Sequence, residues 1–231
     1  AKKYGIRTFV LQVMLNTPRY TCGIVDISKS RAILELIKPL RDDSFTIYLQ
    51  PRAGLDYFAP DIELAKVQLA QVSMLMDDIE PYKKNSPEII HVVSYSEALY
   101  LANPNVINES VQITQTALNH YREYKQKHPN FLDSFEKDIQ IKQDELMSEV
   151  SLLLSSIEEL IEDPYSAQGL YDIFAYGYLQ TPYLWANKED FPNATYFKTK
   201  IQNGSTLLVN NNQERIDAKR LVEFVQSKVK H

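Results

Sequence analysis

The sequence predicts an α/β fold in which three parallel strands alternate with helices, followed by a helical segment with a small β-hairpin. Three observations carry this prediction. Apolar runs of strand length alternate with segments of helical period over residues 1–130, and their short connections imply parallel strands with right-handed crossovers. Two long amphipathic stretches then follow one another without a strand. Finally, Asn203-Gly204 separates two β-rich runs, which is a strong hairpin signal.

The strands are predicted where β-branched and apolar residues gather. The three runs are 6–15 (IRTFVLQVML), 45–49 (FTIYL) and 89–93 (IIHVV). Helices are predicted between them from apolar residues at helical spacing. They cover 28–40, with Asp26 or Ser28 as the cap, and 61–79, with Asp61 as the cap.

The pattern changes near residue 130, where we place a soft domain boundary. Residues 1–130 hold the three β/α units, and residues 131–231 form the helical segment. The first part ends with a predicted helix at 105–127. The second part is predicted to contain helices at 137–161 and 216–229, a short aromatic helix at 169–178 and a hairpin within 195–209.

Composition excludes several function classes. The net charge of −5 argues against a nucleic-acid or anionic-membrane surface, and no apolar run approaches the roughly 20 residues that span a bilayer. Glycine occurs only 6 times, so glycine-built phosphate loops are nearly excluded. The single cysteine, Cys22, rules out an internal disulfide and a multi-cysteine metal site, which favours a cytoplasmic setting.

Residues 1–5 (AKKYG) are typical of the end of a helix that stops at Gly5, and the first predicted strand follows directly. Because no initiator methionine or signal peptide precedes them, we expect the chain to be a piece of a longer polypeptide. Three strands also leave two sheet edges unpaired, so we expect a homo-oligomer, borrowed strands or excision from a larger protein.

Candidate site residues follow from the rule that working groups gather at the C-terminal ends of parallel strands. Arg52 follows Gln50-Pro51. Its planar guanidinium can bind a substrate carboxylate, and the alternative is that it pairs with Asp56 or a neighbouring acid. Gly54 leaves room for a ligand. The loop after the first strand adds further substrate-binding candidates, Asn16 and Arg19.

Past the third strand, Glu97 can accept hydrogen bonds from sugar hydroxyls, act as an acid or base, or simply stabilise a helix start. Ser94 lies in the same stretch. His91 lies inside the apolar run, where a core histidine with its hydrogen bonds satisfied is the plain alternative to an active one. No metal site is predicted.

The order of these motifs resembles the C-terminal part of the barrel-forming subunit of glutamate mutase (methylaspartate mutase), a family of adenosylcobalamin-dependent carbon-skeleton mutases. Residues 50–61 (QPRAGLDYFAPD) resemble the family's penultimate strand, loop and helix start. Residues 89–98 (IIHVVSYSEA) resemble its last barrel strand, which ends in a glutamate-alanine pair. The later helices, Thr181-Pro182 and the hairpin resemble its C-terminal appendage.

The resemblance implies the last three β/α units of a TIM-type barrel, with adenosylcobalamin bound by a separate subunit or domain. It implies that Glu97 holds the ribose of the adenosyl group, with Gln50, Ser94 and Gly54 as further cofactor-binding candidates. The family uses a lysine four residues before that glutamate, and Val93 stands there in this sequence. Arg52 and Glu97 are the candidate catalytic residues.

Three functions follow as expectations. The first is a fragment or divergent member of this mutase family, which performs a radical rearrangement of a carboxylate substrate. The second is a non-catalytic assembly domain that dimerises through its aromatic C-terminal helices; Val93 in place of the lysine favours it. The third is an unrelated barrel lyase or isomerase that uses Arg52 for a carboxylate without a cofactor.

Overall fold

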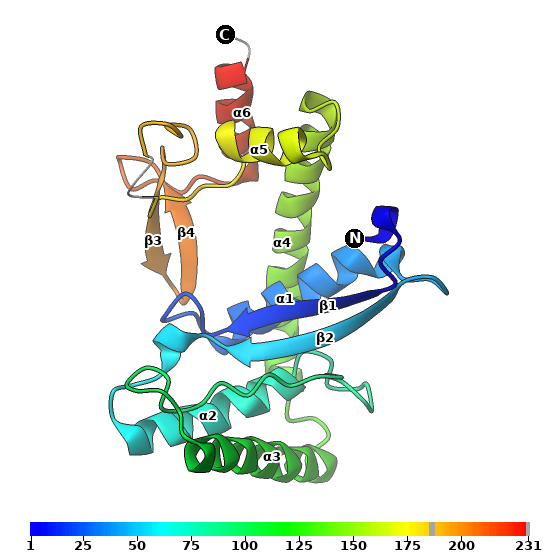
Figure 1. The fold of residues 1–231 in the computed structure, drawn as a ribbon, viewed down its shortest axis with the longest axis vertical. Helices are drawn as coiled ribbons and strands as arrows, with labels where there is room; N and C mark the ends of the chain where they lie inside the picture. The colour runs from blue at the N-terminus through cyan, green and yellow to red at the C-terminus, as the bar shows by residue number, and fades with distance from the viewer. Residues whose placement is uncertain (185–187, 230–231) are drawn as a thin grey trace. The chain divides into compact units, whose positions relative to one another are not determined.

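The computed structural model describes residues 1–184 and 188–229 and is mixed α/β, with two small sheets (Figure 1). The chain forms two compact units, residues 1–144 and 145–231. Helix α4 begins in the first unit and ends in the second. No helix among the described residues is both long and apolar enough to cross a membrane.

The first unit is a parallel sheet with helices. Strands β1 and β2 pair in parallel, with Gln12 opposite Gln50 and Met14 opposite Arg52. The elements in chain order are β1 (Thr8–Leu15), α1 (Gly23–Ile37), β2 (Thr46–Ala53), α2 (Ile62–Asp77), α3 (Pro104–Lys127) and the start of α4 (Asp133–Leu160), with short 3-10 helices at Lys2–Tyr4, Lys38–Leu40 and Leu55–Tyr57.

The predicted third strand is not a regular strand. Residues 89–93 run alongside β2 as an extended segment, held by hydrogen bonds from Ile89 N to Leu49 O and from His91 N to Pro51 O, each 3.2 Å. One isolated bridge pairs His91 with Arg52. Pro51 has no N–H to donate back to this neighbour, which weakens the ladder on that side of β2. No closed barrel is present in the described part of the chain.

Helix α1 begins at Gly23, five residues before the predicted start. Asp26, predicted as a cap, lies inside the first turn with its side chain fully buried. Ser28 and Ser30 return hydrogen bonds to the carbonyls of Ile24 and Asp26, which satisfies both hydroxyls within the helix. The prediction for α2 is confirmed at its start, because Asp61 accepts a hydrogen bond from Leu64 N at 2.8 Å.

The core of the first unit lies on one face of the sheet. Alternate residues of β1 and β2 are buried there, because successive strand side chains point to opposite faces. They pack with residues of α1 and α2 in one apolar cluster, and each fully buried aliphatic side chain stabilises the fold by about 1.5–3 kcal/mol. The cluster includes Leu11, Val13, Leu15, Ile47, Leu49, Ala65, Leu69, Val72 and Met76, with Ile33, Leu34 and Ile37 packed against it.

The second unit holds the end of α4, α5 (Ala167–Ala175), the strands β3 (Lys198–Gln202) and β4 (Ser205–Val209) and α6 (Ala218–Val229). The predicted hairpin is confirmed: β3 and β4 are antiparallel, and Asn203 and Gly204 both have positive φ, at 50° and 69°. A second apolar cluster centres on Tyr178, Val222 and Val225.

Candidate functional site

The loops that leave β1 and β2 are joined to each other. Gly54 N donates to Leu15 O at 3.0 Å. Asp56 accepts hydrogen bonds from Thr17 Oγ1 at 3.1 Å and from Arg19 N at 2.8 Å. The prediction that these two strand ends lie together is therefore confirmed, but loop-to-loop contacts fill the space between them.

Asp26 holds the loop that follows β1. Its buried carboxylate accepts hydrogen bonds from Asn16 N at 2.7 Å and Thr21 Oγ1 at 3.1 Å, and it pairs with Lys29 Nζ at 2.9 Å. Lys29 also donates to Met14 O at 2.8 Å. This cluster was not predicted from the sequence, where its only signal is the (i, i+3) spacing of Asp26 and Lys29.

The predicted loop residues differ in what they can offer a ligand. Asn16 has its Oδ1 buried without a hydrogen-bond partner among the described residues, in a left-handed backbone conformation with φ of 57°. Arg19 is exposed, and its guanidinium lies 5.5 Å from the Tyr20 ring centroid. A Cβ at Gly54 would fall 1.4 Å from Thr17 Oγ1, so Thr17 and not a ligand occupies the space that glycine leaves.

The stretch after the third segment is a turn. Glu97 is exposed there, and its backbone N–H donates to Ser94 O at 3.1 Å. Ser94 is buried and its hydroxyl lies 3.1 Å from that of Ser96. Val93, at the place of the family lysine, is completely buried. Of these residues, only Glu97 presents a polar side chain to solvent.

The predicted cofactor-binding residues can be compared with what an adenosyl group would need. Val93 cannot donate a hydrogen bond, Ser94 is tied to Ser96, and the space at Gly54 is filled. Glu97 and Gln50 remain accessible. The residues therefore do not assemble the pair of ribose-binding groups that the resemblance implies, and we derive no chemical step through that cofactor.

The other polar residues lie on the face of the sheet that the helices leave open. Val10, Met14 and Tyr48 are 41%, 44% and 38% exposed on this face, although parallel sheets are normally covered on both sides. Gln12, Gln50 and Arg52 share it by strand alternation. We call this set, with His91 beside Arg52, the open face.

A short hydrogen-bonded row crosses the open face. Gln12 Nε2 donates to Gln50 Oε1 at 2.8 Å and lies 3.4 Å from His91 Nδ1. His91 is half-buried and is not a core residue, contrary to the plain alternative. Arg52 is half-buried and donates from Nε to Ala53 O at 3.2 Å. Alternate residues of a strand share one face of the sheet, and this alternation was the signal that could have identified Gln12 from the sequence.

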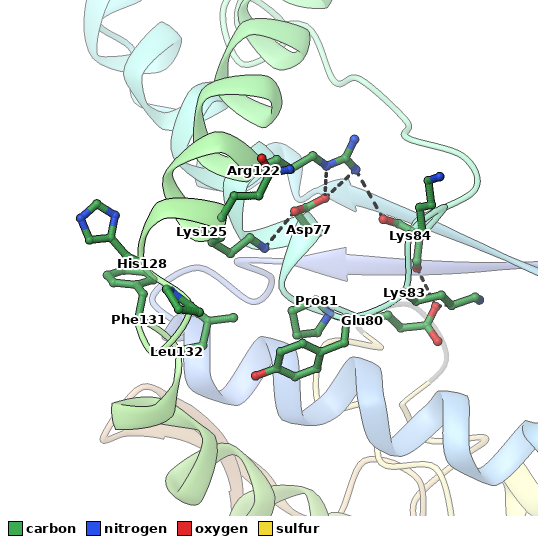
Figure 2. A pocket seen from close by; sticks show the side chains of 14 residues that line it. Asp77, Glu80, Pro81, Lys83, Lys84, Arg122, Lys125, His128, Phe131 and Leu132 are labelled. Carbon is green, nitrogen blue, oxygen red and sulfur yellow. Dashed lines mark hydrogen bonds and ion pairs between the residues drawn. The ribbon is translucent and has the colours of Figure 1, made fainter.

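A cavity of about 390 Å³ lies elsewhere, where α2 and α3 end (Figure 2). Lys125 Nζ lies 2.9 Å from Asp77 Oδ2 and 2.8 Å from Asp78 Oδ1, and Arg122 Nε donates to Asp77 Oδ1 at 2.7 Å. Tyr121 donates to Asp78 Oδ2 at 2.6 Å. Burial raises the pKa of the Asp78 carboxyl, while the bonds from Lys125 and Tyr121 oppose that rise.

The charges of this cavity compensate one another. The four cations Lys83, Lys84, Arg122 and Lys125 equal in number the four carboxylates of Asp77, Asp78, Glu80 and Glu88, and Lys83 lies 3.1 Å from Glu80 and 3.0 Å from Glu88. Charged groups held in mutual pairs leave little net charge for a ligand. The open face, whose arginine has no carboxylate partner among the described residues, is therefore the stronger candidate site.

Comparison with known proteins adds no assignment: no family model matches the chain, and no curated protein matches it.

Proposed function

We propose that the chain is a divergent member of the adenosylcobalamin-dependent carbon-skeleton mutases, and that its open face is one wall of a cavity for a small carboxylate substrate. The observation that carries the proposal is the one-sided cover of a parallel sheet. Helices α1 and α2 pack on the same face, as the outer helices of a TIM-type barrel do, and the opposite face presents polar and large apolar side chains.

In such a barrel, this face lines the interior once further strands pair with the free edges of the sheet. Those strands belong to another segment or to another copy of the chain. Arg52 provides the positive charge for a substrate carboxylate, because its guanidinium lies on this face. The walls exclude water and position the substrate.

Thiol labelling tests the wall in the intact protein as isolated from its cells. In a Cys22→Ser background, Tyr48→Cys places a thiol on the open face, and Leu101→Cys places one at a residue that is 96% exposed. We expect the thiol at position 48 to react at least tenfold more slowly. Equal labelling rates at the two positions would show that nothing covers the open face.

Adenosylcobalamin binding tests the family relationship separately. The readout is the change in the cobalamin spectrum when the intact protein and its cobalamin-binding partner are mixed with a panel of small carboxylates. A substrate-dependent change supports the mutase proposal. Its absence over the whole panel, together with the absence of any affinity for the cofactor, rejects it.

A second candidate function is the assembly domain. The exposed aromatic residues Tyr165, Tyr171 and Tyr183 of the C-terminal part favour it, because large exposed apolar side chains often mark an interface. It predicts a stable dimer by light scattering. It further predicts that Arg52→Ala and Glu97→Ala leave both the dimer and the cellular activity of the protein unchanged.

A further inference from the structure

The open face carries four polar side chains from three neighbouring backbone segments. Gln12 and Gln50 are register partners on β1 and β2, and the isolated bridge places His91 beside Arg52. Gln50 and Arg52 are two residues apart, so they share a face of the strand. These four residues therefore form one compact group.

The placement of the Gln12 amide nitrogen gives the hydrogen bonds of this group a direction. The Gln12 amide nitrogen has only N–H groups, one of which is used by Gln50 Oε1 at 2.8 Å. Because the same nitrogen lies 3.4 Å from His91 Nδ1, it can bond to that atom only as the donor. With Nδ1 as the acceptor of this contact, the proton of a neutral imidazole would reside on Nε2.

The consequence is that the unused groups are mostly donors. The Gln50 oxygen is occupied, which leaves its NH₂ group. The His91 Nε2–H and the two terminal nitrogens of Arg52 also have no hydrogen-bond partner in residues 1–184 and 188–229. These groups together carry one positive charge and several N–H donors, which matches one carboxylate group of a ligand, with its single negative charge, better than a dianionic phosphate group.

We infer that Gln50, His91 and Arg52 bind a ligand carboxylate together, and that Gln12 is a positioning residue that holds His91 in its donor tautomer. This inference deepens the proposed function, since it assigns the substrate-carboxylate site within the same open face. Gln12 acts through its neighbours and does not itself need to touch the ligand.

The tautomer provides a readout that does not depend on activity. Long-range ¹H–¹⁵N spectra of the intact protein distinguish a neutral imidazole protonated on Nε2 from one protonated on Nδ1. We expect the neutral imidazole of His91 to be the Nε2–H form. Gln12→Leu should remove the preference of His91 for the Nε2–H tautomer. Gln12→Glu should reverse this preference, because a carboxylate accepts from Nδ1–H. Gln140→Leu, on the exposed side of α4, is the matched control and leaves the spectrum of His91 unchanged.

Succinate is the probe for binding, and its affinity is measured from the shifts it causes in the ¹H–¹⁵N signals of the His91 imidazole. Arg52→Gln should weaken succinate binding at least tenfold, and Gln12→Leu should weaken it several-fold, as expected for the loss of one net hydrogen bond. An Nδ1–H tautomer in the unmodified protein, or unchanged succinate affinity in Arg52→Gln, would overturn the inference.

The two proposals can fail separately. Succinate binding with the Nε2–H tautomer, but without any cobalamin-dependent change, keeps the carboxylate site and rejects the mutase. A cobalamin-dependent reaction that survives Arg52→Gln and Gln12→Leu at full rate keeps the mutase and rejects this site.

Discussion

Arg31 and Glu136 form a two-point ion pair in which Nη1 lies 2.7 Å from Oε2 and Nη2 lies 3.0 Å from Oε1. The same guanidinium donates from Nε to Ile79 O at 2.9 Å and from Nη2 to Asp78 O at 2.8 Å. One side chain of α1 thus holds both the end of α2 and the start of α4 within the first unit.

Arg31→Met should lower the free energy of unfolding by about 3 kcal/mol, because it leaves a half-buried carboxylate and two carbonyls without their donor. Urea denaturation followed by circular dichroism measures the change. Glu35→Gln is the control: it breaks the exposed pair with Lys38, 3.2 Å long, and should change stability by less than about 0.5 kcal/mol. Equal effects of the two substitutions would contradict this account.

Gly54→Ala should destabilise the loop region through a steric clash with Thr17. The backbone at Gly54 has φ of −75°, which any residue adopts, so the cost comes from packing alone. We expect a loss of about 2 kcal/mol. Thr17→Gly should recover part of it in the double variant. If the two changes prove additive in a double-mutant cycle, the contact is not the cause.

Two positions with positive φ, Gly204 in the β3–β4 turn and Gln213 in the loop after β4, should respond in opposite ways to substitution. Gly204→Ala should cost about 1 kcal/mol, because a Cβ disfavours the left-handed conformation at φ of 69°. Gln213 adopts φ of 65° without being glycine. Gln213→Gly should therefore be neutral or slightly stabilising, since it relieves that strain. Thermal unfolding measures both, and a stabilising Gly204→Ala would disprove the turn assignment.

Tyr95 and Glu109 predict a pH dependence. The Tyr95 hydroxyl donates to Glu109, which lowers the pKa of the Glu109 carboxyl and raises the pKa of Tyr95 to about 12. Lys66, 2.9 Å from Glu109, lowers the carboxyl pKa further. A carboxyl with a depressed folded pKa contributes stability that is present above its unfolded value of about 4.5 and is lost as pH falls through the folded pKa.

The stability difference between the unmodified protein and Tyr95→Phe should therefore shrink as pH falls from about 5 towards 3. Carboxyl ¹³C shifts should show the Glu109 pKa rising towards its ordinary value in Tyr95→Phe. Tyr165→Phe is the control, because Tyr165 donates to Glu158 instead and should leave Glu109 unaffected. An unchanged Glu109 titration in Tyr95→Phe would exclude the hydrogen bond as the cause.

The sequence alone determined the elements whose signals are local. Asp61 caps α2 because a side-chain oxygen three residues before a free backbone N–H needs no distant partner. Asn203-Gly204 forms the turn because those residue types tolerate positive φ. The alternation along β1 and β2 likewise fixed which side chains share a face of the sheet.

Only the tertiary structure decided what those faces and strand ends do. Residues 89–93 have the composition of a strand, but their pairing depends on Pro51 in the neighbouring strand. Asp26 resembled a cap, yet burial beside Lys29 made it the anchor of a loop. The direction of the row Gln12–Gln50–His91 depends on atoms up to 79 positions apart, and no local pattern specifies such a contact.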